Sequence, residues 1–369
     1  MNPQHRDYPQ SAVPSNSTLT LHTVTFNRVK GFTLVELMIA LVLGLLISAA
    51  ALQIFYTSSV NSRRQEASSQ IQDNAIFGFS QIQRHLRRAN YGAKSTSAYD
   101  EFFMNHLTPQ GGVVLTAPSG TGTPVSWLQG NLSGLVLNGK AVPAALLSSN
   151  ASGNSISNID SITNSDQLTI QYRSDRTGTF DCEGTAIPEG FYVIERYFVR
   201  MDTTVTPNAP GLACASAIYN YDESVAGSPT GMDIKEYIVP GETARTANNL
   251  AGTGTIIIPN VDYFRAKLGI SSSRDFATDP QNLDIAYIPI PTTTNLTTAL
   301  SARRIVSLQI GILARSDNPT ATPQTNSELA FTVLDKSNVK LNSAAVNGPT
   351  YLRNVYETTV LLRNARGGL

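Results

Sequence analysis

The chain has 369 residues, enough for one large domain or two modest ones, and only 15% of them are charged. Its 27 lysines and arginines balance 27 aspartates and glutamates, so the sequence lacks the excess of positive charge that is typical of nucleic-acid-binding domains. Serine, threonine, asparagine and glycine are frequent in the second half, which favours a loop-rich β domain over a packed α/β enzyme.

The first predicted element is an apolar run from Phe32 to Tyr56, FTLVELMIALVLGLLISAAALQIFY, whose single charged residue is Glu36. At about 1.5 Å per residue, a helix of this length crosses a bilayer core of about 30 Å. Arg28 and Lys30 stand directly before the run, so the positive-inside rule predicts a cytoplasmic N-terminus and an exported remainder. The run is too long for an ordinary secretory signal, which leaves a plain membrane anchor as the simpler alternative.

A plain anchor leaves Glu36 unexplained, because an ionised carboxylate inside a membrane helix is costly unless it is paired. The segment from Lys30 to Ala40, KGFTLVELMIA, resembles the signal of type IV prepilins and of the related pseudopilins. The resemblance implies that a prepilin peptidase cuts between Gly31 and Phe32 and methylates the new amino group of Phe32. It also implies that Glu36 offsets the N-terminal ammonium of a neighbouring subunit, since a buried charge is retained only when paired.

Gly31 lacks a side chain, which allows an enzyme to approach the scissile backbone closely. The alternative, a glycine that only starts the helix, is disfavoured because no N-cap residue is expected beside it. The leader of residues 1–31 is longer than is usual in this family. A translation start nearer the cleavage site, at Val24 or Val29, would leave the cleavage itself unaltered.

Beyond the membrane run, the residue spacing predicts that the same helix continues to about Ala89. Its apolar residues form one stripe at helical spacing: Ala67, Ile71, Ala75, Phe79, Ile82, Leu86 and Ala89. This half of the helix is therefore expected to lie half-buried against a globular domain. His85 stands among arginines and is expected on a solvated face, and Gly92 is a candidate C-cap.

From about residue 94 onward the apolar period changes to two, which predicts an antiparallel sheet. Six stretches have the composition of strands: 167–173, 191–200, 234–239, 255–258, 305–313 and 356–362. The polar stretches 148–165, 271–282 and 316–327 are expected to be surface loops or insertions.

The expected fold is therefore α+β and pilin-like, with a long N-terminal helix packed on an antiparallel β domain that carries loop insertions. Its expected division is a cleaved leader (1–31), a transmembrane or filament-core half of the helix (32–56), an amphipathic half (57–92) and one β domain (93–369).

Later landmarks are similar to those of PilW-type minor pilins. They are residues 72–92, 166–170 followed by 181–184, 260–262 followed by 268–269, 303–315 and 358–364. This resemblance implies a subunit that primes pilus assembly or lies at the filament tip, and so supports pilus biogenesis, twitching motility, adhesion or DNA uptake. The implied partners are other minor pilins, the major pilin, the pilus tip adhesin, the prepilin peptidase and the inner-membrane assembly platform. The implied location is the bacterial inner membrane, with a periplasmic C-terminal domain, and then the pilus.

Cys182 and Cys214 are the only cysteines, and composition alone leaves open a disulfide or two unrelated buried thiols. Export favours the disulfide, which would stabilise the domain by roughly 3 to 4 kcal/mol in the chain-entropy model. Two cysteines alone do not make a zinc centre, so no metal site is expected.

No catalytic constellation is visible in the sequence, so neither an enzyme nor a cofactor is expected. His5 and His22 lie in the leader, His106 has no visible partner, and the two Gly-Thr-Gly-Thr segments lack the lysine that a phosphate loop needs. A J-like pseudopilin of type II secretion is the first alternative function, and a signal-anchored periplasmic enzyme or binding module is the second. No direct nucleic-acid binding is predicted, although a host ligand or DNA on the β domain stays an open alternative.

Overall fold

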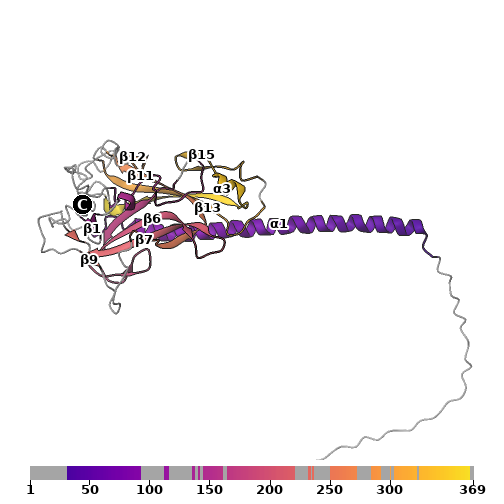
Figure 1. Ribbon diagram of the computed structural model, residues 1–369, viewed down its shortest axis with the longest axis horizontal. Helices are drawn as coiled ribbons and strands as arrows, with labels where there is room; N and C mark the ends of the chain where they lie inside the picture. The colour runs from indigo at the N-terminus through magenta and orange to yellow at the C-terminus, as the bar shows by residue number, and fades with distance from the viewer. Residues whose placement is uncertain are drawn as a thin grey trace, which may run out of the picture. The chain divides into compact units, whose positions relative to one another are not determined.

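A computed structural model gives the architecture of the chain (Figure 1). The structure describes residues 31–92, 112–115, 135–137, 140–141, 144–160, 164–220, 232–233, 235–236, 250–271, 284–291, 300, 303–321 and 324–365. The chain divides into two units, Met1–Thr57 and Ser58–Leu369. One helix, α1 (Leu34–Leu86), contains the boundary between them.

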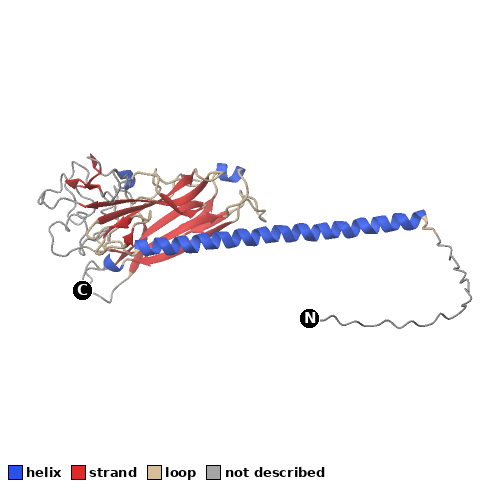
Figure 2. Cartoon of the chain, turned by 90° about the horizontal axis from the view of Figure 1, so that it is seen from below, coloured by secondary structure: helices blue, strands red, loops and turns tan. Residues whose placement is uncertain are grey.

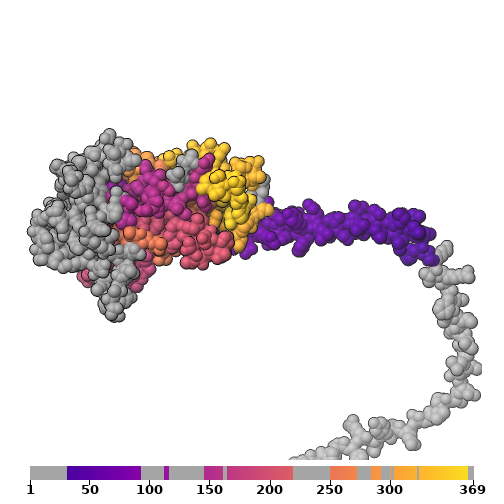
Figure 3. Space-filling view, in the orientation of Figure 1, coloured from indigo at the N-terminus to yellow at the C-terminus, as the bar shows by residue number. Residues whose placement is uncertain are grey.

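In the first unit, the described residues form the beginning of α1, and their apolar side chains are uncovered. Every residue from Gly31 to Ser58 is exposed, and Figure 3 shows this part of the helix in indigo without a covering layer. The segment is long and apolar enough to cross a membrane. A helix that is apolar on all sides needs lipid or other apolar helices around it.

In the second unit, the rest of α1 lies along the strands of the β domain (Figure 2). Its buried residues are Ala67, Ile71, Ala75, Gly78, Phe79, Ile82, His85 and Leu86. The predicted apolar stripe is thereby confirmed, but the expectation for His85 was wrong. This side chain lies on the buried face, because a hydrogen-bonding partner from the β domain meets it there.

The helix ends three residues earlier than predicted, at Leu86, and turns follow it as far as Gly92. Asn90 is the first residue after the helix with a left-handed backbone, at φ 61°, and Gly92 is the second, at φ 74°. A Cβ atom at Gly92 would lie 2.4 Å from the carbonyl oxygen of Arg173. Glycine is therefore needed at this position for close approach to the sheet as well as for backbone freedom.

Two antiparallel sheets form the body of the second unit, where the sequence predicts one. The first has the order β10–β7–β6–β3, with β9 also paired to β7. Its strands are β3 (Leu168–Arg173), β6 (Tyr192–Asp202), β7 (Ala209–Asn220), β9 (Lys235–Glu236) and β10 (Thr255–Pro259). The second has the order β12–β11–β13–β16. Its strands are β11 (Val261–Ser271), β12 (Ile285–Pro289), β13 (Ile305–Arg315) and β16 (Arg353–Leu361).

Asn260 connects the two sheets, since it stands between β10 of the first and β11 of the second. Its φ of 56° is left-handed, a conformation that asparagine tolerates better than most residues. Its side-chain amide donates to Asp317 Oδ1 at 2.6 Å. A single polar residue thus fixes the point where the chain changes sheets.

Short elements complete the described part of the fold. They are β1 (Leu135–Leu137), β2 (Lys140–Ala141), β4 (Thr179–Phe180), β5 (Ala186–Ile187), β8 (Met232–Asp233), β14 (Ala330–Val333), β15 (Lys336–Lys340), η1 (Ala144–Leu146), α3 (Ser343–Asn347) and η3 (Arg363–Ala365). The pair β1–β8 is parallel, and the pairs β1–β2, β4–β5 and β14–β15 are antiparallel.

One continuous apolar core joins the helix stripe to both sheets. It includes Ile71, Phe79 and Leu86 from α1, Ile170 from β3 and Ile310 from β13. Burying this apolar surface is the main favourable term that holds the second half of α1 to the domain.

The segment 148–165, predicted to be a surface loop, is instead partly buried where it is described, and it bonds to strands of both sheets. Ser155 and Ser165 are fully buried. The Ser155 hydroxyl accepts a hydrogen bond from the backbone N–H of Val199 at 2.9 Å, and the Ser148 hydroxyl accepts one from Thr169 N–H at 2.8 Å. Serine is polar in composition, but here its hydroxyls satisfy strand backbone groups that would otherwise be buried without partners.

The strands predicted at 167–173, 191–200, 255–258, 305–313 and 356–362 are present as β3, β6, β10, β13 and β16. The predicted strand 234–239 is described only at Lys235–Glu236, and the predicted loop 271–282 lies almost entirely outside the described residues. Residues 1–30 of the leader, His106 and the first Gly-Thr-Gly-Thr segment, residues 120–123, also lie outside them.

Candidate functional site

The start of α1 carries the residues that the sequence motif singles out. Gly31 and Phe32 precede the helix, and Phe32 is 86% exposed. Thr33 caps the helix, since its hydroxyl accepts a hydrogen bond from Glu36 N–H at 3.2 Å. Glu36 Oε2 in turn accepts from the Thr33 backbone N–H and hydroxyl, both at 3.1 Å.

This reciprocal arrangement is a capping box, in which two backbone donors at the helix start are satisfied by side chains. It corrects the expectation that no N-cap residue accompanies Gly31. The spacing Thr-x-x-Glu in the sequence is itself typical of a capping box, so Glu36 has a local role besides the one expected in assembly. The same carboxylate therefore stabilises the helix start within the chain.

Glu36 has no cationic partner among the residues that the structure describes. Its hydrogen bonds come from the neutral groups of Thr33, and the side chains around it are exposed and apolar. In an apolar surrounding, an ionised carboxylate is stabilised chiefly by a nearby positive charge. The start of α1 thus offers a negative charge that a cation from outside the described chain can neutralise.

A second polar site lies where α1 meets the first sheet. We call it the Glu195 cluster: Glu195, His85, Tyr172, Tyr197 and the backbone N–H of Cys182. Glu195 is fully buried on β6. Its Oε1 lies 2.9 Å from His85 Nδ1, and it accepts from the Tyr172 hydroxyl at 2.8 Å and from Cys182 N–H at 3.0 Å. Its Oε2 accepts from the Tyr197 hydroxyl at 2.6 Å.

The electrostatics of the Glu195 cluster favour an ionised carboxylate. Burial raises the pKa of Glu195, but the attraction of His85 and the hydrogen bonds from His85, Tyr197 and Tyr172 outweigh it and bring the pKa below its ordinary value. Burial raises the pKa values of Tyr172 and Tyr197 well above the ordinary tyrosine value, so both hydroxyls stay protonated donors. The cluster therefore connects the helix, two strands and the disulfide loop through one charge.

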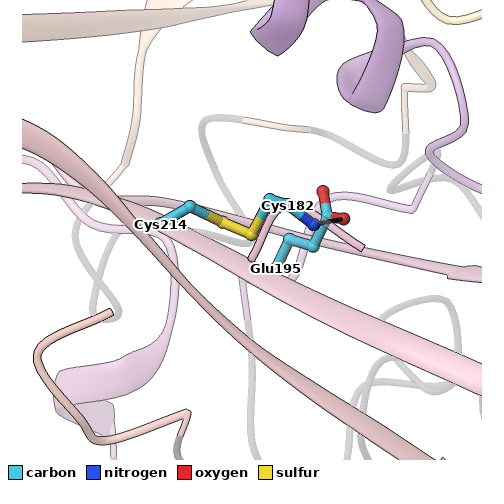
Figure 4. Close-up of side chains that lie close together, drawn as sticks. All are labelled: Cys182, Glu195 and Cys214. Atoms are coloured by element: carbon cyan, nitrogen blue, oxygen red, sulfur yellow. Dashed lines mark hydrogen bonds between the residues drawn. A yellow bond between two sulfur atoms is a disulfide. The ribbon is translucent and has the colours of Figure 1, made fainter. Parts of the chain in front are cut away.

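Cys182 and Cys214 form a disulfide bond, as export of the domain predicts. Figure 4 shows the bond beside the Glu195 carboxylate, which faces the backbone nitrogen of Cys182. The two sulfurs and a Glu195 oxygen lie within 4.8 Å of one another, a spacing that also suits metal ligands. Metals bind cysteine as the thiolate, however, and a disulfide offers none. The group is structural in this oxidised form.

The loop of Cys182 is fastened to β7 by its own acidic residues. Asp181 Oδ1 accepts from the backbone N–H of Thr185 at 2.6 Å and of Glu183 at 3.0 Å, while its Oδ2 accepts from the Ser216 hydroxyl at 2.6 Å. Glu183 accepts from Ser216 N–H at 2.9 Å. These contacts hold the Asp-Cys-Glu-Gly segment in place on both sides of the disulfide.

A third set of contacts fastens the end of α1. The side-chain amide of Asn364 donates to the carbonyl oxygens of Arg87 at 3.1 Å and Ala89 at 3.4 Å, and Asn90 donates back to the carbonyl of Asn364 at 2.9 Å. Carbonyls at a helix end lack intrahelical partners, so these bonds act as a cap supplied from the other end of the chain.

The structure keeps the predicted residues in two separate groups. Gly31, Phe32 and Glu36 belong to the start of α1, and Cys182 and Cys214 belong to the β domain. Sequence reasoning missed Thr33, His85 and Glu195. For Thr33 the capping-box spacing was a usable signal, whereas His85 and Glu195 are 110 positions apart and no local pattern indicates their contact.

Comparisons with known proteins give two family matches. Residues 26–52 match the prokaryotic N-terminal methylation motif, and residues 218–364 match the family described as type IV pilus-assembly protein W. Among solved structures, a type IV-like pilin from Thermus thermophilus is similar, with 12% sequence identity, 80% of this chain and 98% of that chain covered, and a TM-score of 0.30. No curated protein matches by sequence.

The two matches fall on the two units of the chain. The methylation motif covers the start of α1, where Gly31, Phe32 and Glu36 lie, and the other match covers the end of β7 and the strands from β8 to β16. The apolar start of α1 agrees with membrane anchoring, and both matches point to a structural subunit of a pilus. The methylation motif, the match to the W family and the antiparallel β domain on a long N-terminal helix together support a type IV minor pilin of the PilW type.

Proposed function

We propose that this minor pilin is made as a prepilin and is built into a type IV pilus, where it primes assembly or lies at the tip. The observation that supports this most directly is the start of α1. It combines an exposed Gly31-Phe32 bond, an exposed apolar helix and a carboxylate without a cationic partner in the described chain. Each of these features needs something from outside the chain: a peptidase, a membrane and a neighbouring subunit.

In this proposal, prepilin peptidase removes residues 1–31 and methylates the amino group of Phe32. Residues 32–56 then cross the inner membrane once, with the β domain in the periplasm, until the subunit enters the filament. There the Glu36 carboxylate pairs with the N-terminal ammonium of a neighbouring subunit. Because an unpaired charge in an apolar bundle is costly, this pairing selects the axial position of the incoming subunit.

The proposed partners follow from the same helix. Other minor pilins and the major pilin have to supply apolar helices that cover residues 32–56, and the assembly platform has to extract the subunit from the membrane. A large tip adhesin is the partner proposed for the β domain. Twitching motility, attachment and DNA uptake would then depend on this subunit through the pilus rather than through chemistry of its own.

Mass spectrometry of the protein from membranes, with and without an active prepilin peptidase, tests the first step. We expect a mature chain that begins at N-methylated Phe32, and its loss both in the peptidase-deficient strain and in Gly31→Ala. An intact leader in every strain would instead mean a plain membrane anchor.

Assembly is tested separately from cleavage with Glu36→Gln. Glutamine keeps the size of the side chain and can still accept from Thr33, but it removes the charge. We expect normal cleavage and methylation together with loss of the subunit from sheared filaments. Recovery of the variant in filaments at the wild-type level would refute the role of Glu36 and leave the cleavage step standing.

A further inference from the structure

A pocket of about 190 Å³ lies where the end of α1 meets the end of β3. Arg87 and Arg88 line it from the helix side, and Arg173 and Arg176 line it from the sheet side. Tyr91 and Asp175 complete the polar lining that matters here. The family matches and the assembly proposal give this pocket no role.

The lining carries four guanidinium groups against one carboxylate. That carboxylate is already engaged, because the Tyr91 hydroxyl donates to Asp175 Oδ2 and Arg176 Nε lies 4.0 Å from Asp175 Oδ1. The hydrogen bond to Asp175 is the largest of the effects that raise the pKa of Tyr91, so the tyrosine stays a protonated donor. Three positive charges are left without a counter-charge in the lining.

Two of the guanidinium groups are held in place from behind. Arg88 Nη1 donates to the carbonyl oxygen of Phe180 at 2.6 Å, and Arg173 Nε donates to the carbonyl oxygen of Gly190 at 3.1 Å. A guanidinium has five N–H donors, so each retains donors for a ligand. The Arg87 side chain has no hydrogen-bonding or ionic partner within the described part of the chain and is exposed. The pocket therefore combines two anchored cations with one free cation.

We propose that this pocket binds a phosphate dianion, either the free ion or the phosphate group of a monoester. The planar guanidinium of arginine can bind a phosphate group with two parallel hydrogen bonds. A monoester carries about −1.5 to −2 charges near neutral pH and three acceptor oxygens, which offsets most of the excess, whereas a carboxylate offsets one charge. The volume is below the roughly 300 to 1,000 Å³ typical of sites for whole drug-sized ligands, so one charged group fits better than a complete nucleotide.

Calorimetric titration of the detergent-solubilised full-length chain tests the proposal. Inorganic phosphate and glucose 6-phosphate are the two probes, and acetate and a short oligonucleotide of phosphodiesters are the comparison anions. We expect saturable binding of phosphate to one site and weaker binding of acetate. Tighter binding of glucose 6-phosphate than of inorganic phosphate would identify a phosphorylated sugar as the source, and the reverse would identify the free ion.

Two variants locate the binding. Arg87→Gln removes a free exposed charge and is expected to weaken phosphate binding about tenfold through a lost charge-assisted hydrogen bond. Arg176→Gln removes the cation that pairs with Asp175, and the uncompensated carboxylate is expected to weaken phosphate binding by repulsion. Arg63→Gln is the matched control, because Arg63 is exposed on α1 and does not line the pocket. It lies about 35 Å along the helix from Leu86, so salt screens its charge, and the affinity of the variant should stay within about twofold of wild type.

Several outcomes would overturn the proposal. They are the absence of saturable phosphate binding at concentrations of about 1 mM, equal weakening by Arg63→Gln and Arg87→Gln, and acetate or oligonucleotide affinity that matches that of phosphate. None of these outcomes bears on leader cleavage or filament assembly, so a failure here is distinguishable from a failure of the proposed function.

Discussion

The two halves of α1 differ in where their partners come from. From Leu34 to Thr57 the side chains are exposed, and Glu36 bonds only to its neighbour Thr33. From Ser58 to Leu86 an apolar stripe is buried, and His85 meets Glu195 across 110 positions of sequence. One regular helix thus contains a segment that its own chain covers and a segment whose apolar side chains the described chain leaves exposed.

The largest expected effect comes from removing Glu195, the buried glutamate that contacts the covered half of α1. Glu195→Ala leaves His85, two tyrosine hydroxyls and a backbone N–H without their acceptor, and we expect a loss of about 3 to 5 kcal/mol in unfolding free energy. Chemical denaturation of the full-length chain in detergent measures it. Glu36→Ala, in the other half, should leave the unfolding of the β domain unchanged; equal losses would mean that the two halves are not energetically separate.

Ionisation of Glu195 predicts that the unfolding free energy depends on pH. Its pKa is lowered on folding, so its stabilising contribution is complete above the unfolded value of about 4.5 and is lost as the pH falls through the folded pKa. The difference in unfolding free energy between wild type and Glu195→Ala should therefore shrink in acid. Urea denaturation at pH 7, 5 and 3 checks this, and a constant difference over that range would contradict it.

Removal of the disulfide should have a comparable but smaller effect. The bond joins residues 32 positions apart, and replacing both cysteines by alanine is expected to cost roughly 3 to 4 kcal/mol. Denaturation curves of Cys182→Ala/Cys214→Ala and of the reduced wild type should agree with each other. The helix content of residues 34–57 should not change, because the disulfide belongs to the other unit of the chain.

The same substitution, glycine to leucine, can be made at Gly44 in the exposed half of α1 and at Gly78 in the buried half. A Cβ atom at Gly78 would lie 2.2 Å from Ile258 Cγ1, whereas nothing lies within 4 Å of one at Gly44. Gly78→Leu is expected to destabilise the domain by about 1 to 3 kcal/mol through overpacking. Gly44→Leu should be neutral or slightly stabilising for the helix in detergent micelles, because leucine is the better helix former. Equal thermal shifts for the two variants would break the comparison.

The smallest expected effect is local to the helix start. Thr33→Ala removes the cap and should cost about 1 kcal/mol of helix stability there. Amide hydrogen exchange of residues 34–37 in micelles should accelerate while that of residues 71–86 stays unchanged. Thr33→Ser keeps the hydroxyl and is the matched control; acceleration with serine as well would assign the effect to the lost methyl group rather than to the capping box.

The helix, its apolar stripe and most of the predicted strands were readable from the sequence because each has a local period. β7 and β11 were not predicted as strands. β7 begins Ala-Pro-Gly-Leu-Ala-Cys, small residues of weak strand propensity, and is held by its pairing with β6 on one side and β10 on the other. β11 contains charges that argue against a buried strand until their partners are known. Arg265 pairs with Asp166 at 3.1 Å and with Asp335 at 2.8 Å.

The residues of the candidate site also divide into those that local sequence predicts and those that only tertiary contacts reveal. Gly31, Phe32 and Glu36 stand in one short motif, so sequence alone could select them. The Glu195 cluster is assembled from α1, β3, β6 and the disulfide loop, and its members are ordinary residues in their local surroundings. Burial gives them their role, and burial of a charged residue follows from tertiary contacts that no window of sequence contains.

The end of α1 cannot be capped until Asn364 has been synthesised. Its two partners on the helix side, Arg87 and Ala89, are synthesised 277 and 275 positions earlier. Ribosomes build the chain from its N-terminus, so the apolar stripe emerges long before β16 and Asn364 exist to complete its cover. Until then the apolar stripe is exposed and prone to aggregation. A nascent chain of this kind depends on a holding factor or on rapid completion of synthesis, and a message truncated just before codon 353 should yield an aggregation-prone chain rather than a shortened domain.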